Sequence, residues 1–494
     1  MKNIPALLLF LVAFQVSANI RHVPGAYSSI QAALNSCQGF DTVLVQSGTY
    51  TEKLSWPSTA GIKLLSSAGP DSTLISGGQT GRVLAISTAI ADTNTHISGF
   101  TFRDGYLNTG QGYGAGIYII NASVILENCI VSANHVYIPG GHGYGAGVHL
   151  DNSATRIINS TIIGNSIDSA SWCYGAGIYI SSGNPLISNV NILNNRANSD
   201  SWCYGVGLYA RANAIVNIER TTVSGNYSGN NATWYYGNGI YLGNVTATLT
   251  NVLVADNISG SGGNFNYGGG IFCDGNAGVM NLVNVTVAEN YRTGNGVING
   301  SGIYVRDATV IAINSIFYNP NPGSEGMQSL NGTLDILFSN VRGGYAGLGN
   351  QNVLPGFIGN SDYHLLPASL CAGEATDNGA PTIDLDGNAR PLPAATMPDQ
   401  GCYEVNQSAT ALQNEDDNEN IINVYPNPVI SGSPVYVSNI SGTVLISDIT
   451  GKVYSKKFIT GSNDALSTSG LPAGNYLIHS INGKRKLFQV AAKQ

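Results

Sequence analysis

The chain has 494 residues, too many for one ordinary compact domain but enough for an elongated repeat domain with an appendage. Only 10% of the residues are charged and 62 are Gly without a three-residue period, which excludes helix-rich, highly charged disordered and collagen-like proteins. Residues 19–403 carry 22 acidic against 13 basic residues, so the basic face that nucleic-acid binding needs is not expected.

The N-terminus has the pattern of an export signal covering residues 1–18. Lys2 supplies a positive start, Ala6 to Val16 form an apolar stretch, and Val16-Ser17-Ala18 offers small residues for cleavage. The stretch is too short to span a bilayer, and no later segment reaches 18 apolar residues. We therefore expect a mature chain that begins near Asn19, lies outside the cytoplasm and has no transmembrane segment.

Residues 27–37, with the sequence YSSIQAALNSC, predict a short amphipathic helix that starts after Ser28 or Ser29. A repeat protein needs its ends covered, and this helix precedes the repeats. We expect it to cover the open end of the first repeat.

Internal repetition then dominates the chain. The octets are GYGAGIYI at 112–119, GYGAGVHL at 143–150, CYGAGIYI at 173–180, CYGVGLYA at 203–210, YYGNGIYL at 235–242 and NYGGGIFC at 266–273, with a weaker NGSGIYV at 299–305. Between them, a second phrase ends on an Asn at positions 134, 165, 195, 226, 257 and 290, and an earlier Asn recurs at 128, 159, 189, 251, 284 and 314. The period is about 31 residues.

Each repeat contains short alternating apolar runs and no stretch of helical period, so it must stack on its neighbours to bury a face. Stacked in register, equivalent Asn side chains can bond one above another, and Gly allows the sharp corners. The fold class predicted is all-β, a right-handed parallel β-helix with one coil per repeat. A propeller fits the period poorly.

Alternation along the octet strand separates core positions from an outward row. The outward row contains Tyr118, His149, Tyr179, Tyr209, Tyr241, Phe272 and Tyr304, and Trp172, Trp202 and Trp234 lie in the longer loops before the octets. Aromatic residues repeated at the coil spacing, about 4.8 Å, could stack along a polysaccharide. The alternative is that the stacked rings only stabilise the coils, which we favour for the outward row, whereas for the Trp residues we favour binding.

The two ends of the repeat region carry a resemblance. RHVPGAYSSIQAALNSCQGFDTVLVQSGTYTEKL, from Arg21, is similar to the opening of secreted pectate-lyase-like and pectin-esterase-like β-helix proteins. Residues 362–404 resemble the closing segment of bacterial choice-of-anchor β-helix proteins. The resemblance implies the fold over residues 20–404. It leaves the chemistry open, because such proteins include lyases, hydrolases, esterases and binders.

Catalytic candidates are sparse. Lyases that the chain resembles use an Arg or Lys base and carboxylates that hold calcium, which points to His149, Asp151 and Arg211 as weak candidates. Asp151 and Asp274 are four coils apart, too far to share one calcium ion, and Asp274 with Arg306 on the next coil suggests a surface ion pair. We expect no cofactor. Asp384 and Asp386 could contribute to a calcium loop, although a structural turn is favoured.

The seven Cys residues are too few for a disulfide scaffold. Cys173 and Cys203 occupy equivalent places on adjacent coils, where a disulfide is plausible, and Cys371 with Cys402 could tie the closing segment.

Residues 404–420 are polar and acidic and predict a linker. Residues 421–494 contain short alternating strands with turns at YPNP, TGK and NGK, which predict a small β-sandwich. The order YPNP, D-x-x-G-K, L-x-x-G-x-Y and a Lys-rich last strand resembles the Bacteroidetes type IX secretion C-terminal sorting domain. The resemblance implies passage across the outer membrane by that machinery, to the cell surface or beyond.

The sequence thus predicts a secreted or surface β-helix, residues 19–403, that binds or adheres to polysaccharide. A polysaccharide lyase or hydrolase acting in the same groove is the first alternative. A structural surface protein without a specific ligand is the second.

Overall fold

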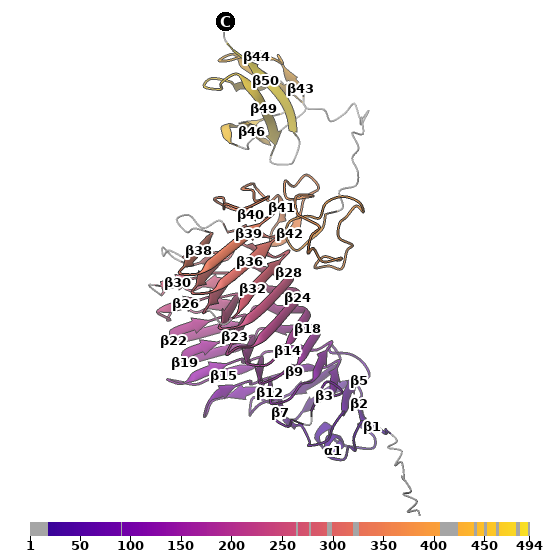
Figure 1. Cartoon of the computed structure of the whole chain (residues 1–494). Helices are drawn as coiled ribbons and strands as arrows, with labels where there is room; N and C mark the ends of the chain where they lie inside the picture. The colour runs from indigo at the N-terminus through magenta and orange to yellow at the C-terminus, as the bar shows by residue number, and fades with distance from the viewer. Residues whose placement is uncertain are drawn as a thin grey trace, which may run out of the picture. The chain divides into compact units, whose positions relative to one another are not determined.

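The computed structural model describes residues 18–89, 91–262, 265–275, 278–293, 299–319, 326–405, 423–438, 442–448, 452–460, 464–480 and 485–492. The chain divides into two compact units with the boundary between residues 408 and 409 (Figure 1). The predicted export signal, apart from Ala18, and residues 406–420 of the predicted linker lie outside the described residues.

The first unit is a stack of coils whose strands form three parallel sheets (Figure 1). Sheet 1 contains β1 (Ile20–Val23), β2 (Thr42–Val45), β3 (Gly48–Thr51), β5 (Lys63–Ser66), β6 (Thr73–Ser76), β8 (His96–Ser98), β9 (Thr101–Arg103), β13 (Ile125–Glu127), β14 (Ile130–Ser132), β18 (Arg156–Ile163), β21 (Leu186–Leu193), β24 (Ile215–Ser224), β28 (Thr246–Ala255), β32 (Val279–Val283), β33 (Thr286–Ala288), β36 (Thr309–Ile313), β37 (Ile316–Tyr318), β39 (Thr333–Leu337) and β40 (Asn340–Val341).

Sheets 2 and 3 complete each coil. Sheet 2 contains β4 (Leu54–Ser55), β7 (Leu84–Ile86), β12 (Ile117–Ile120), β17 (Val148–Asp151), β20 (Ile178–Ser181), β23 (Leu208–Arg211), β27 (Ile240–Gly243), β31 (Ile271–Asp274), β35 (Ile303–Arg306) and β38 (Met327–Leu330). Sheet 3 contains β10 (Tyr106–Leu107), β11 (Gly112–Tyr113), β15 (His135–Tyr137), β16 (His142–Tyr144), β19 (Ser166–Tyr174), β22 (Arg196–Tyr204), β25 (Tyr227–Ser228), β26 (Trp234–Tyr236), β29 (Ile258–Ser259), β30 (Phe265–Tyr267) and β34 (Tyr291–Arg292).

The register follows the sequence repeat. Tyr179 pairs with Tyr209, and Tyr209 with Tyr241, across parallel strands of sheet 2. Equivalent residues of successive repeats therefore lie directly beside one another. This pairing confirms the predicted parallel β-helix.

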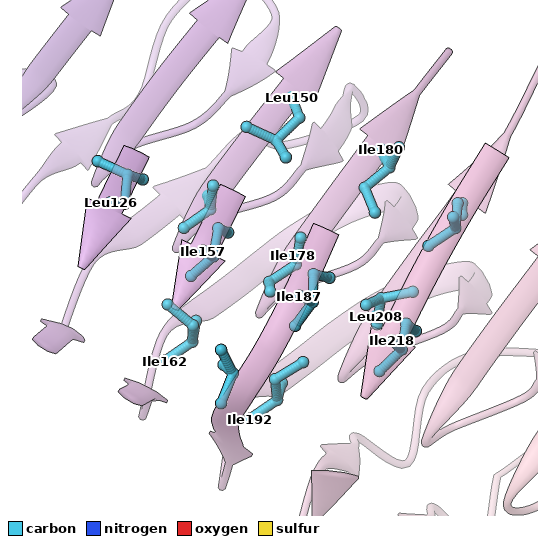
Figure 2. Packing of buried hydrophobic residues seen from close by; sticks show 14 of the residues in the cluster. Leu126, Leu150, Ile157, Ile162, Ile178, Ile180, Ile187, Ile192, Leu208 and Ile218 are labelled. Atoms are coloured by element: carbon cyan, nitrogen blue, oxygen red, sulfur yellow. The ribbon is translucent and has the colours of Figure 1, made fainter. Parts of the chain in front are cut away.

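The inward positions of the octets form the core between sheets 1 and 2. Figure 2 shows Leu150 and Ile180 of sheet 2 with Ile157, Ile187 and Ile218 of sheet 1, and each of these side chains is buried. Burial of one such side chain contributes about 1.5–3 kcal/mol relative to exposure, repeated at every coil. Stacking of the coils thus supplies the core that one repeat lacks.

A buried ladder of Asn side chains marks the turn from sheet 1 to sheet 3. Asn165 Nδ2 donates to Asn195 Oδ1 at 3.0 Å, and Asn195 Nδ2 donates to Asn226 Oδ1 at the same distance. Gly177 must be Gly because a Cβ there would lie 2.9 Å from Asn195 Nδ2 and 2.5 Å from the carbonyl oxygen of Gly207. The predicted stacked amides are confirmed.

The first coil is covered by α1 (Ile30–Asn35). Ser29 is its N-cap, with its side chain accepting from the backbone N–H of Ala32 at 3.1 Å. The carboxylate of Glu52 accepts from the first-turn N–H groups of Ile30 and Gln31 at 2.9 Å. A helix therefore lies where the sequence predicted one, and of the two predicted starts, Ser28 and Ser29, the structure has Ser29.

The closing segment, residues 355–405, contains the antiparallel pair β41 (Phe357–Gly359) and β42 (Asp362–Leu365) and contacts the last coils through the earlier Asn of the repeat. That Asn has left-handed backbone, for example φ 52° at Asn251, Asn284 and φ 56° at Asn314. The side chain of Asn314 exchanges two hydrogen bonds with the backbone of Thr376, and Asn251 donates to the carbonyl of Ile383. A turn residue of the repeat thereby attaches the closing segment.

The end of this segment buries an ion pair. Arg390 and Glu404 lie 2.6 Å apart with both side chains fully buried. Burial raises the pKa of Glu404 to about 7, because the nearby Arg390 offsets only part of the lost hydration. Glu404, predicted as the first linker residue, belongs instead to the folded closing segment.

The second unit has two sheets that share one apolar core. The smaller contains β43 (Asn423–Tyr425), β45 (Pro434–Ser438) and β48 (Asp464–Ser467), and the larger contains β44 (Val429–Ile430), β46 (Gly442–Asp448), β47 (Val453–Ile459), β49 (Gly474–Ser480) and β50 (Arg485–Ala491). The strands pair antiparallel except for β44, which pairs with β50 in parallel. The predicted small β-sandwich is confirmed.

Candidate functional site

Three columns of aromatic side chains run along the outer surfaces of sheets 2 and 3. The aromatic spine, on sheet 2, is Tyr118, His149, Tyr179, Tyr209, Tyr241, Phe272 and Tyr304. The tyrosine column, on sheet 3, is Tyr113, Tyr144, Tyr174, Tyr204, Tyr236 and Tyr267, and the tryptophan column beside it is His142, Trp172, Trp202, Trp234 and Phe265. All three lie outside the apolar core between sheets 1 and 2.

The aromatic spine stacks as predicted but is not exposed. Tyr179 and Tyr209 are parallel within 4° with ring centroids 5.4 Å apart, and Tyr209 and Tyr241 follow at 4.8 Å. Tyr179 is 2% exposed, and the four spine residues after it are 6% exposed or less. The prediction of a surface row was wrong here, because the tyrosine column covers the spine.

The tyrosine column interlocks successive coils. Tyr144 makes an edge contact at 5.1 Å with Tyr179 of the following coil, and Tyr174 contacts Tyr209 in the same way. Such edge-to-face contacts, each worth about 0.5–1.5 kcal/mol beyond burial, join one coil to the next. The spine therefore has the packing of a structural element, the reading favoured from the sequence.

The tryptophan column is the outermost of the three. Trp172, Trp202 and Trp234 are each half-buried, and Phe265 is 37% exposed. Trp172 and Trp202 stack at 5.1 Å, whereas Trp202 and Trp234 are tilted by 54° at 6.2 Å. The regular stacking is interrupted at this step and at the first one, where His142 and Trp172 meet edge to face at 4.6 Å.

This arrangement determines what a ligand can contact. A stacked ring uses its two faces for its neighbours, so most of each column presents ring edges, hydroxyl groups and indole N–H groups to solvent. Among the described residues, ring faces are left without a stacked neighbour at the two interrupted steps and at the ends of the columns. Sugars therefore cannot stack along the whole length of the aromatic columns. A ligand would meet mainly ring edges and their polar groups, here called the rim, with a few accessible ring faces.

Guanidinium groups lie over rings of the spine. Arg82 lies 4.3 Å from the ring of Tyr118 and donates to the carbonyls of Tyr113 and Gly114. Arg211 is exposed, and its guanidinium lies 5.7 Å from the ring of Tyr179 and makes no hydrogen bond or ion pair with any residue that the structure describes. Arg211 is thus an available cation on the aromatic surface.

Asp274 and Arg306 form the ion pair expected on adjacent coils. Arg306 Nε and Nη2 donate to the two oxygens of Asp274 at 2.8 and 2.7 Å, and the Tyr241 hydroxyl donates to the same carboxylate at 2.8 Å. The hydrogen bond to Asp274 raises the pKa of Arg306 although burial opposes it. Arg306 also lines a pocket with Trp234, Tyr236, Tyr267, Phe272 and Tyr304.

The sequence did not predict this pocket. The sequence feature that could have indicated the pocket is the last repeat. Asn299 there replaces the tyrosine of the earlier octets and pairs with Tyr267.

The weak catalytic candidates do not form a constellation. His149 is 4% exposed and stacked against Tyr179 at 4.8 Å, and burial lowers its pKa to about 3. It is therefore inaccessible as a general base, and the suggestion of that role was wrong. Asp151 and Arg211 occupy the same column but are separated by the coil of Ser181.

The proposed disulfides are absent from the described structure, in which all seven cysteines are buried thiols. Cys173 and Cys203 pair in register on neighbouring strands. Their side chains leave the sheet in parallel, whereas a disulfide needs Cβ atoms drawn to about 3.8 Å. Cys371 and Cys402 pack in two different apolar clusters. The structure forms neither of the two disulfides, and the pairings stay predictions.

Asp384 and Asp386 are committed to protein partners. The Asp384 carboxylate accepts from the backbone N–H groups of Asn388 and Glu404 at 2.8 and 2.9 Å, and Asp386 lies 2.7 Å from His364 Nε2. These contacts form the structural turn that the sequence favoured over a calcium loop. Among the described residues, no three His, Cys, Asp or Glu side chains are grouped to hold a metal ion.

Comparison with known proteins identifies the second unit. Residues 423–491 match the family of the secretion system C-terminal sorting domain. The chain is therefore a type IX secretion substrate, delivered to the cell surface or the extracellular space. No helix in the described part of the chain is both long and apolar enough to cross a membrane. No curated protein matches the sequence significantly.

Solved structures similar to this chain include a pectate lyase and an alginate lyase. Pectate lyase Pel9A is 13% identical, with 79% of this chain and 97% of that one covered at a TM-score of 0.45. An alginate lyase from Paenibacillus sp. str. FPU-7 is 16% identical, with 64% and 99% covered at a TM-score of 0.29. Likenesses this distant transfer neither a substrate nor a mechanism.

Proposed function

We propose that this type IX secretion substrate is a glycan-binding protein whose contact surface is the rim of the aromatic columns on sheet 3. One observation carries the proposal. Half-exposed Trp side chains lie in register on three successive coils, beside tyrosines whose rings are packed and fixed. Rigid aromatic groups with polar edges bind at low conformational cost, and the coil spacing is close to the length of one sugar residue.

Polar groups around the columns support the same role. The indole N–H of each Trp is a hydrogen-bond donor, and the exposed Arg211 adds a cation beside the spine. Sugar hydroxyls accept from such donors, while the C–H face of a sugar packs against an accessible ring face. The rim offers both kinds of contact on one surface.

The test measures retention of the mature chain, residues 19–494, on a set of neutral and acidic polysaccharides, with released reducing ends and unsaturated products assayed in the same samples. We expect retention without product. Trp202→Leu should weaken retention at least fivefold, and the matched control is Tyr137→Leu, because Tyr137 is an aromatic residue of sheet 3 that is 39% exposed and outside the columns. Product formation would support an enzyme instead, and no retention on any glycan would leave a structural role.

A further inference from the structure

The aromatic columns stop at one place. The tyrosine column ends at Tyr267, whose neighbour on the next coil is Asn299, and the spine ends at Tyr304, which pairs with Gln328. Tyr267 and Tyr304 contact each other edge to face at 5.0 Å. Among the described residues neither ring has a further aromatic neighbour. Tyr267 is partly exposed at this end, whereas Tyr304 is 6% exposed.

A pocket of about 90 Å³ lies at this end. Arg306, Leu330 and five aromatic residues line it, the aromatic ones being Trp234, Tyr236, Tyr267, Phe272 and Tyr304. The guanidinium lies 5.2 Å from the ring of Phe272 and 5.7 Å from that of Tyr236. The pocket is therefore apolar on its aromatic side and polar at one edge, a combination typical of small-ligand sites.

The polar edge carries no net charge. Asp274 takes two hydrogen bonds from Arg306 and a third from Tyr241, so the cation is neutralised and held in place. The two bonds to Asp274 use Nε and Nη2 of Arg306, so Nη1 faces the pocket lining, where the Tyr236 hydroxyl is a further neighbour of the guanidinium. An acidic sugar would have to compete with Asp274 for this guanidinium, whereas an uncharged sugar needs only hydroxyl-group acceptors.

We propose that this pocket is a subsite for one uncharged sugar ring, stacked on the aromatic end of the columns and hydrogen-bonded by Arg306. The inference rests on the proposed glycan binding and deepens it by naming the ligand class. The pocket differs in this respect from the surface around Arg211. The guanidinium of Arg211 is exposed and has no carboxylate partner, so it would favour an acidic glycan.

The experiment titrates the mature chain, residues 19–494, by calorimetry with cellohexaose, mannohexaose and xylohexaose as uncharged probes and hexagalacturonate and hexamannuronate as acidic ones. We expect at least one uncharged probe to bind more tightly than both acidic ones, with an affinity that changes less than twofold between low and high salt. Arg306→Gln should weaken that binding about tenfold, the effect of one lost charge-assisted hydrogen bond. Arg156→Gln, the matched control at an exposed arginine of sheet 1 outside the columns, should change it less than twofold.

Each of the other possible results would overturn a specific part of the proposal. Binding that Arg306→Gln leaves unchanged would overturn the subsite while leaving glycan binding intact. Tighter binding of an acidic probe that Arg211→Gln abolishes would overturn the uncharged ligand class. Failure of every probe would overturn the proposed function and the subsite together. If Arg306→Gln unfolds because Asp274 is left unpaired, Asp274→Asn/Arg306→Gln keeps an uncharged amide pair, and the same tenfold loss is expected.

Discussion

The side-chain amide of Asn165 donates to Oδ1 of Asn195 at 3.0 Å, and the backbone N–H of Asn165 donates to the same oxygen. Asn195 in turn donates through Nδ2 to the carbonyl of Ile162 and to Asn226. Both residues are fully buried. One side chain therefore satisfies polar groups of three coils, and the ladder fixes the register in which the aromatic columns stack.

Replacing one member of this ladder should destabilise the solenoid strongly. Asn195→Ala removes the acceptor of the Asn165 backbone N–H and of one Asn165 amide hydrogen, and the donor to the carbonyl of Ile162. We therefore expect a loss of about 3 kcal/mol in the free energy of unfolding. Urea unfolding followed by far-UV circular dichroism measures it. The control is Asn189→Gly, at an exposed Asn with φ 54°, where Gly keeps the left-handed backbone and less than about 1 kcal/mol should be lost. Equal losses in the two variants would contradict the role assigned to the buried ladder.

The aromatic spine should behave as a structural element. Tyr179→Ala removes a ring that is 2% exposed and stacked on both sides, so we expect the unfolding free energy to fall by about 3–5 kcal/mol. Tyr179→Phe keeps the ring and should cost less than about 1 kcal/mol, with glycan retention unchanged. A stable Tyr179→Ala variant that had lost only glycan retention would show that the spine is a binding surface after all.

The fold could be predicted because the sequence repeats. Recurrence of the same residue types about every 31 positions implies that equivalent residues of neighbouring repeats contact one another. Octet glycines, Asn ladders and inward Ile positions each need a neighbour in the next copy, so their recurrence implied parallel coils. The helix after Ser29 followed from local capping chemistry. These features depend on the order of residues along one coil and on its immediate neighbours.

The exposure of the aromatic rows could not be predicted in the same way. Alternation showed that Tyr179 points away from the core, which is correct, but whether another layer covers it depends on where sheet 3 folds back. The pocket beside Arg306 has the same cause, since it arises where the columns end rather than from a motif. Burial of Glu404 likewise depends on a contact with Arg390 that the polar sequence around it did not indicate.

The number of free thiols per molecule tests whether the cysteines are unpaired. Because all seven are buried thiols, unreduced mature chain should release seven thiols per molecule in denaturant and almost none under native conditions, by titration with a thiol reagent. Burial raises the pKa of Cys371 and Cys402 to about 12, which further slows their native reaction. Five thiols in denaturant, with a peptide crosslinked between Cys173 and Cys203, would restore the disulfide that the sequence suggested.

The closing segment should carry a pH-dependent contribution from His364. Its Nδ1 lies 2.6 Å from Asp362 and its Nε2 2.7 Å from Asp386, and the ring stacks on Tyr403 at 3.8 Å. Burial lowers the pKa of His364, but hydrogen bonds to the two carboxylates outweigh it and the net pKa is raised. Only the doubly protonated ring can donate to both partners.

A histidine whose folded pKa lies above its unfolded value stabilises fully below about 6.5 and loses that contribution as the pH rises through the folded value. We therefore expect the melting temperature to fall between pH 6 and pH 9, and to fall less in His364→Gln. Burial raises the pKa of Asp399 to about 6 and that of Glu404 to about 7, so their contributions to stability also fall as the pH rises. Because these two groups are present in both proteins, the difference in melting temperature between the unmodified chain and His364→Gln reports His364 alone. Superimposable curves for both proteins would show that His364 is not protonated between the carboxylates.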